Sequence, residues 1–211
     1  MTAEQVKTRF LIELDAVASG AAPGFTDSEI SELVDKAQKD LILQLAKAKK
    51  WDDLYTLITK IGLEVDDGDY RSKSHIVDLP TDYGYYINAY VKVTSTVYNG
   101  ISSGAYWANC KEISADIMDR FLPTFYNTPF FKEPVIFFSK ASEALNILVD
   151  SYTTLTNGEG NLQLTYVKIP TTFSITDAHT LELPETLHDT VIAMAVEEAV
   201  KSLKTAKIST Q

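Results

Sequence analysis

The residues of this chain that could do chemistry are few and scattered. Its three histidines are His75, His179 and His188, and each has an aspartate within three positions. A zinc site needs paired histidines on one helix face, or histidine and cysteine ligands at short spacing, and no histidines here are paired in this way. We therefore interpret all three as structural residues. His188, in the first turn of a predicted helix, should hydrogen-bond or pack locally.

Other kinds of reactive group are equally sparse. Cys110 is the single cysteine, which excludes an intramolecular disulfide and a thiolate metal cluster. We expect it to be buried and inert, with a reactive thiol as the alternative. The acidic run at residues 64–69 lacks the spacing and the closing glutamate of a calcium loop, so we interpret it as a solvated turn.

The sequence contains no phosphate-binding glycine loop and no nucleophile elbow, and nothing singles out a carboxylate pair among its 29 acidic residues. We therefore predict no catalytic residues, no cofactor, no metal and no enzymatic activity.

The charge balance argues against specific binding to nucleic acid. The net charge is −10, which repels phosphate backbones. Lys47, Lys49, Lys50 and Trp51 are the only basic and aromatic concentration, and positive charge at the end of a helix explains the lysines more simply. No apolar run approaches the roughly 20 residues that span a bilayer, so no membrane contact is expected. Residues 1–5 do not have the pattern of a secretory signal.

Three helices are predicted in the first third of the chain. Capping boxes of Thr2 with Gln5 and of Thr26 with Glu29 begin the first two. A third helix is expected over residues 52–61, ending at Gly62. The apolar positions that should pack them together are Val6, Phe10, Leu14 and Val17, then Ile30, Leu33, Val34, Ala37, Leu41, Leu45 and Ala48, then Leu54, Leu57, Ile58 and Ile61.

The middle of the chain changes to the period of two that is typical of strands. The alternation is cleanest over residues 85–98, which predicts a sheet with one buried and one wet face. After Asn99-Gly100 we expect a loop rather than a returning strand, then a helix over about residues 109–122, and again a loop over residues 151–160. The predicted strands cover residues 75–79, 85–98, 135–139, 144–150 and 161–169.

Two segments contain more apolar residues than is typical of an element that is exposed on one side. Residues 125–134 contain four aromatics and two prolines, which is incompatible with a regular element. This segment is either a partner site or a cover for the sheet of its own subunit. The final helix, from Pro184, carries two apolar stripes. It must be covered on most of its circumference, by its own core or by a neighbouring subunit.

Together these elements predict an α+β fold. It has an N-terminal helical bundle, a mainly antiparallel β-sheet in the middle, and a C-terminal helix that packs back. We assign residues 1–62 to the helical part. Residues 63–211 form a β-rich part with an inserted helix and the C-terminal helix, and both parts belong to one compact structural unit.

Several short patterns, spread over nearly the whole chain, are informative together. The helical part contains Thr2-Ala3-Glu4-Gln5-Val6, Arg9-Phe10 with Glu13, and Ala37-Gln38. The middle contains Asp78-Leu79-Pro80, Asp82-Tyr83, and Asn127, Pro129, Phe130 and Pro134. The end contains Tyr166, Lys168 and Pro170, then Leu183-Pro184-Glu185 with Leu187-His188 ahead of an apolar helix. This order resembles the head–tail connector proteins of tailed bacteriophages, particularly the neck ring or adaptor proteins of crAss-like phages.

The resemblance implies a virion structural protein of the neck or tail, made in the host cytoplasm. It implies a homo-oligomeric ring of about twelve subunits, closed by a heterologous interface. The ring would contact the portal protein and other neck or tail proteins, and DNA would pass through it without specific binding. We expect interface residues in the two apolar segments, at Asn127, Pro129, Phe130, Phe131, Pro134, Leu187, Val191 and Met194.

Two other classes of function stay open. A soluble, non-catalytic interaction module would be monomeric or dimeric. A virion-associated hydrolase would need titratable residues that converge in a cleft.

Replacing both Phe130 and Phe131 by aspartate should prevent ring formation and leave the monomer folded, because the change puts charges in place of two apolar contacts. Light scattering measures the assembly, and circular dichroism measures the fold. A double variant that still forms rings would make this segment intramolecular cover.

Overall fold

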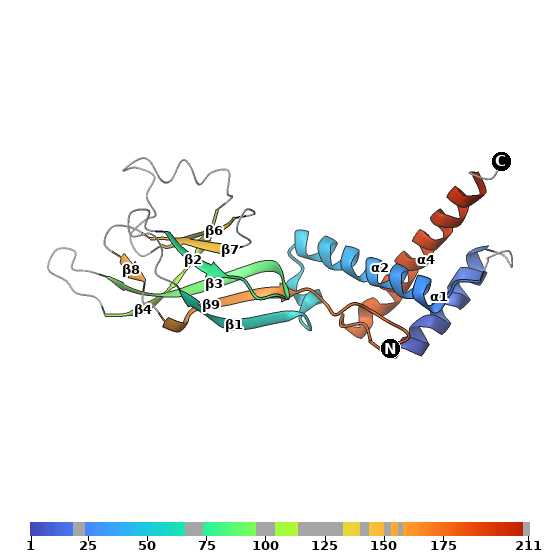
Figure 1. Cartoon of the computed structure of the whole chain (residues 1–211), viewed down its shortest axis with the longest axis horizontal. Helices are drawn as coiled ribbons and strands as arrows, with labels where there is room; N and C mark the ends of the chain where they lie inside the picture. The colour runs from blue at the N-terminus through green and yellow to red at the C-terminus, as the bar shows by residue number, and fades with distance from the viewer. Residues whose placement is uncertain are drawn as a thin grey trace. The chain divides into compact units, whose positions relative to one another are not determined.

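The computed structural model describes residues 1–18, 24–65, 74–95, 104–113, 133–139, 144–149, 153–155 and 158–208. It separates two compact units, one made of Met1–Ile58 with Lys168–Gln211 and the other of Thr59–Val167 (Figure 1). This division differs from the predicted one, which placed a boundary at residue 62 and grouped the C-terminal helix with the strands. The fold class is α+β, as predicted, with helices at both ends of the chain and strands between them.

The helical unit contains α1 (Ala3–Ala18), α2 (Asp27–Lys47) and α4 (Glu185–Ile208). Both predicted capping boxes form. The N–H of Gln5 donates to Thr2 Oγ1 at 3.3 Å, and the N–H of Thr2 donates to Gln5 Oε1 at 2.9 Å. Thr26 and Glu29 make the same reciprocal pair at 3.3 and 2.8 Å. These bonds satisfy backbone donors that the first turn of a helix leaves unpaired, so the sequence sets both starting points correctly.

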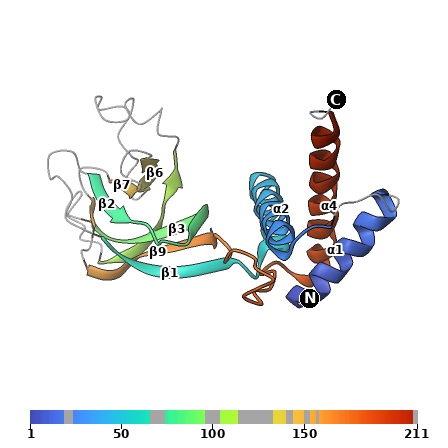
Figure 2. The same ribbon diagram turned by 45° about the vertical axis from the view of Figure 1, so that its right-hand side comes forward.

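The core of this unit forms where α4 packs against both α1 and α2 (Figure 2). The apolar residues of α4 that are buried there are Val191, Ile192, Ala195, Val196 and Ala199. The two-stripe helix is thus covered by its own chain along this stretch. On α1 the buried stripe is Ala3, Val6, Phe10 and Leu14. Val17 continues the period of that stripe but is 63% exposed, against the prediction.

The predicted third helix is wrong. Residues Trp51–Leu54 form a short 3-10 helix, η1, and strand β1 (Ile58–Val65) follows. The apolar spacing of residues 54–61 fits a helix, but β-branched residues also fit a strand, and pairing with β9 decides in favour of the strand. Gly62, predicted as a helix stop, lies within this strand.

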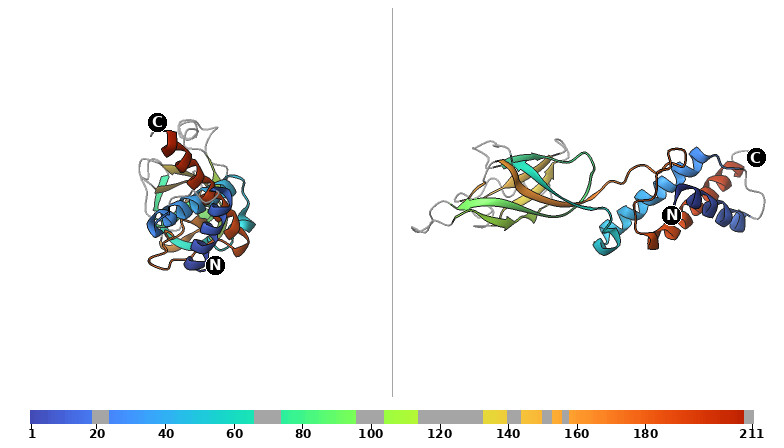
Figure 3. Two further views of the ribbon diagram at one scale, coloured as in Figure 1. Left: turned by 90° about the vertical axis from the view of Figure 1, so that its right-hand side faces the viewer. Right: turned by 90° about the horizontal axis from the view of Figure 1, so that it is seen from below.

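The second unit is built from two sheets (Figure 3). The first has the order β1-β9-β3-β4, with β8 also paired to β3, and the second has the order β2-β7-β6-β5. Their strands are β2 (Ser74–Asp78), β3 (Tyr83–Ser95), β4 (Tyr106–Asn109), β5 (Lys111–Glu112), β6 (Val135–Ser139), β7 (Ala144–Leu148), β8 (Thr153–Leu155) and β9 (Gly158–Lys168). The predicted strands over residues 75–79, 135–139 and 161–169 are therefore confirmed, and those over 85–98 and 144–150 are confirmed for their described residues.

Three local predictions in this unit are wrong. The strand β4 returns antiparallel to β3, where a loop was expected, and β8 lies within the second expected loop. Residues 111 and 112 form β5, parallel to β6, instead of beginning a helix. The cause is long-range pairing: the N–H of Lys111 donates to the carbonyl of Pro134, and that of Ile113 to the carbonyl of Ile136, both at 2.9 Å. Residues 114–122 of the expected helix, and the Asn99-Gly100 turn, lie outside the described residues.

One apolar core is shared by the two sheets. It includes Ala89, Val91 and Val93 from β3, Leu162 and Leu164 from β9, and Ile136, Leu145 and Ile147 from the other sheet. The alternation predicted for β3 is confirmed in this respect, since Tyr90 between these residues is exposed. All five residues of β7 are buried, so the second sheet is covered on both faces at this strand.

A close approach between β1 and β9 depends on two glycines. A Cβ atom on Gly62 would lie 3.1 Å from the Cα of Gly160, and Gly160 itself has φ of +73°. An L-residue in that backbone region costs roughly 1–2 kcal/mol. Gly160 is therefore needed for its conformation, and Gly62 for its lack of a side chain.

Gly160→Ala should lower the free energy of unfolding by about 1–2 kcal/mol, because it forces a Cβ into a left-handed backbone. Chemical denaturation followed by circular dichroism measures this change. Gly104→Ala is the matched control, since nothing lies within 4 Å of a Cβ built there. An equal loss of stability in both variants would contradict the role given to the left-handed backbone at Gly160.

Candidate functional site

The three histidines are not brought together as a catalytic or metal-binding group. His188 is buried, and its Nε2 lies 2.8 Å from the carbonyl oxygen of Leu183, so the predicted local hydrogen bond is confirmed. The exposed ring of His179 lies with Nδ1 3.1 Å from the carbonyl oxygen of Thr172. His75 lies on β2 in the other unit. Among the described residues, no group of three His, Cys, Asp or Glu side chains could hold a metal ion.

Cys110 is buried, as predicted, at the point where the chain crosses from β4 to β5. Its N–H donates to the carbonyl of Ala89 at 2.9 Å. Burial raises the pKa of its thiol to about 12. A thiol with that pKa carries very little thiolate at neutral pH, so Cys110 is a poor nucleophile.

Many residues of the short patterns noted above make structural contacts. In the β unit, the hydroxyl of Tyr166 donates to Asp82 Oδ1 at 2.8 Å, and its ring lies 5.6 Å from that of Tyr83. Burial, followed by the neighbouring Asp82 carboxylate, raises the pKa of Tyr166 to about 12. Tyr83 also stacks on Phe138 of the opposite sheet, with centroids 5.5 Å apart. These aromatic contacts join the two sheets.

In the helical unit, polar side chains of α2, among them Gln38 of these patterns, contact residues 169–183, which follow β9. We call this irregular segment the strap. Three side chains on one face of α2 accept backbone N–H groups of the strap. Ser31 Oγ accepts from Ile175 at 3.1 Å, Asp35 Oδ1 from Phe173 at 3.0 Å, and Gln38 Oε1 from Glu182 at 3.2 Å. The spacing of four and three residues places them in line along the helix, so α2 fixes the path of the strap.

Glu182 anchors the strap a second time. Its carboxylate pairs with Lys168 at 2.5 Å and accepts the N–H of Thr171 at 3.0 Å. Burial by itself would raise the pKa of this carboxyl, but the hydrogen bonds from Lys168 and Thr171 outweigh it and lower the pKa. The charged form of Glu182 is therefore stabilised in the folded protein.

The predicted interface residues fall into three groups. Asn127, Pro129, Phe130 and Phe131 lie outside the described residues, so their role stays a prediction. Pro134 is buried next to β6. On α4, Val191 is fully buried in the helical core, whereas Leu187 and Met194 are half-buried. Val191 is therefore covered within its own chain.

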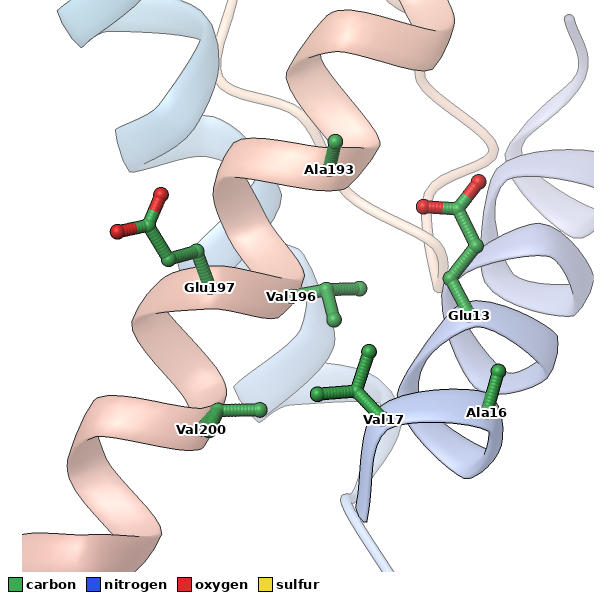
Figure 4. A pocket seen from close by; sticks show the side chains of 7 residues that line it. All are labelled: Glu13, Ala16, Val17, Ala193, Val196, Glu197 and Val200. Carbon is green, nitrogen blue, oxygen red and sulfur yellow. The ribbon is translucent and has the colours of Figure 1, made fainter. Parts of the chain in front are cut away.

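The strongest candidate for a binding site is an apolar groove between α1 and α4 (Figure 4). Its volume is about 370 Å³, and it is lined by Glu13, Ala16, Val17, Ala193, Val196, Glu197 and Val200. Val17, Val196 and Val200 point toward one another across it, and the two glutamates stand at its margins. Ile12, on the same helix as Val17, is 61% exposed. This arrangement can bind an apolar side chain, and it brings together no acid–base pair.

Sequence reasoning missed this groove, and the exposed apolar residues of α1 that could be noticed in the sequence do not line it. Leu11 and Ile12 are apolar residues of α1 that do not belong to its buried stripe, and both are exposed. Apolar residues on the outer side of an amphipathic helix indicate a second contact surface. The exposure of Val17 could not have been found in this way, because it depends on where α4 lies.

Comparison with known proteins does not assign the chain to a family: no family model matches it, and no curated protein matches it either. Within the part of the chain that the structure describes, no helix has the length and apolar character needed to cross a membrane.

Glu182→Gln should lower the free energy of unfolding at pH 7 by roughly 1 kcal/mol, because it removes a charge-assisted anchor of the strap. Since the folded pKa of Glu182 lies below the ordinary value of 4.5, its contribution is present above about pH 4.5 and is lost as the pH falls further. The difference between wild type and variant should therefore disappear in acid.

Denaturation curves at several pH values measure this difference. Glu64→Gln, at an exposed position of β1, is the control and should change stability at none of them. A difference between wild type and Glu182→Gln that stays constant down to pH 3 would contradict the role of the Glu182 charge.

Proposed function

We propose that this chain is a structural protein of the neck of a tailed phage, that it assembles into a ring, and that it catalyses no reaction. The ring connects the portal and capsid to the tail, and packaged DNA passes through its channel. The proposal has two parts, assembly through protein–protein contacts and a place in a virion. Different observations support them.

The observation that carries the first part is the uncovered apolar surface of the helical unit. Val17 and Ile12 are each more than 60% exposed, and Val17 borders a groove whose floor is apolar. Burying apolar surface yields about 25 cal/mol per Å², so a partner that covers this groove gains stability from it. Exposed apolar patches of this kind are typical of protein–protein contact sites.

The contacts that the potentially reactive side chains make also favour a structural role. His188, Cys110, Tyr166 and Asp82 are engaged in contacts that hold their own unit together. A hydrolase would instead direct such groups into a cleft that admits substrate. The described pocket between α1 and α4 contains two glutamates, each already paired with a cation of its own helix.

The second part rests on the resemblance of the short patterns to phage connector proteins. The net charge of −10 supports it, because a channel wall of that sign attracts no phosphate backbone. An interaction module that does not assemble is the competing function, and the state of assembly separates the two.

Replacing both Ile12 and Val17 by Gln should weaken self-assembly by roughly thirtyfold or more, because it removes the apolar contacts of an interface centre and leaves a good helix former at each position. Mass photometry over a range of concentrations measures assembly of the full chain, and negative-stain microscopy identifies rings.

Ile76→Gln, at a similarly exposed apolar position on β2, is the control and should assemble like the wild type. A wild-type chain that stays monomeric, alone and with a portal protein, would contradict the proposed ring. Rings that are unaffected by the double substitution would place their interface away from α1.

A further inference from the structure

We infer that the groove between α1 and α4 receives the end of α2 from a second copy of this chain, with Tyr55 as the side chain that enters it. This inference rests on the ring function proposed above, because it names the two surfaces that would join neighbouring subunits.

The groove has room for a large side chain and carries acidic margins. Its volume of about 370 Å³ lies at the lower end of the range for sites that bind small ligands, which suits one inserted side chain. Glu13 pairs with Arg9 at 3.1 Å, and Glu197 pairs with Lys201 at 2.8 Å. These are pairs within one helix that lie largely in solvent and contribute little to stability, so either carboxylate can take a new cation at little cost.

The end of α2 has the complementary character. Lys47, Lys49 and Lys50 are all exposed there. The chain turns at Lys49, which has φ of +54°, and the N–H of Lys50 donates to the carbonyl of Leu45. Tyr55 follows η1 directly and is 64% exposed, the largest exposed fraction among the large hydrophobic side chains that are described. The exposed Asp52 and Asp53 lie between these lysines and Tyr55, so residues 47–55 carry three positive and two negative charges, a net charge of +1. Exposed tyrosines are typical anchors of protein interfaces, and this net charge is opposite in sign to the two glutamates of the groove.

No element contributes to both surfaces. The groove is formed by α1 and α4, whereas the lysines lie at the end of α2 and directly after it, and Tyr55 follows η1. Contact between them therefore joins two different surfaces of neighbouring copies, and such a heterologous contact can repeat around a ring. Two grooves facing each other would instead bring the acidic margins together, which like-charge repulsion disfavours.

Cysteine cross-linking of the full-length chain tests this contact. The natural Cys110 is buried, so the background from it is low. A disulfide forms only where two Cα atoms come within about 7 Å. A Val17→Cys chain mixed with a Tyr55→Cys chain should form a cross-linked pair under mild oxidation, and neither variant should form one alone. A chain with both substitutions should give a ladder of cross-linked oligomers.

Charge reversal tests the same contact without a covalent bond. Glu13→Lys with Glu197→Lys, or Lys49→Glu with Lys50→Glu, should each weaken assembly by roughly tenfold or more, because each brings like charges together. A chain that carries all four substitutions should assemble nearly as well as the wild type. Lys60→Glu with Glu64→Lys, both exposed on β1, is the matched control and should have no effect.

The outcomes separate this inference from the function on which it rests. Rings without the mixed cross-link, or without rescue by the fourfold reversal, would overturn the inferred contact and leave the ring standing. Cross-linking of Val17→Cys with itself would overturn it in favour of a symmetric dimer. A chain that forms neither rings nor cross-links, alone and with a portal protein, would overturn both.

Discussion

The structure depends on one closure: the backbone N–H of Lys168 donates to the carbonyl of Leu57 at 2.9 Å. At this point the chain returns to the helical unit that it left about a hundred residues earlier. The intervening residues Thr59–Val167 form a unit of their own, whose first and last strands, β1 and β9, are neighbours in one sheet. Strand pairing therefore brings the ends of the insertion together. Folding of the β unit itself offsets the entropy that is lost in closing so long a loop. The helix α4 can then complete the core that α1 and α2 begin.

The strap shows how this return is made specific. It has no regular secondary structure to hold it, so its backbone donors need other partners. Ser31, Asp35 and Gln38 of α2 supply three of them, and Glu182 adds the link to Lys168. An apolar surface alone would tolerate several positions of the segment. Hydrogen bonds to three side chains along one face of α2 restrict the strap to a single position. This position fixes where α4 begins.

Local signals explain which parts of the fold were predictable. Thr2 with Gln5, and Thr26 with Glu29, form capping boxes that act within four residues, so both helix starts followed from the sequence. Residues 58–61 and 111–112 were misassigned to helices because their partners lie far away in the chain. β1 pairs with β9, and β5 pairs in parallel with β6. The candidate site shows the same limit. Val191 was expected at an interface and is buried in its own core, whereas Val17 was expected in the core and borders a groove. The helical spacing of apolar residues indicates that Val17 and Val191 both face the helical core. The position of the neighbouring helix determines which of the two it covers.

These constraints bear on how the chain would bind a partner. Association costs free energy whenever side chains or loops must become ordered at the interface. Here the groove is made by two helices whose relative position is already fixed by a common core with α2, and its valines stand on regular helical backbone. Little ordering is then required when a side chain enters it, and most of the gain from burying apolar surface is retained as binding free energy. The polar side chains of Ser31, Asp35 and Gln38, which hold the strap on α2, add to this rigidity.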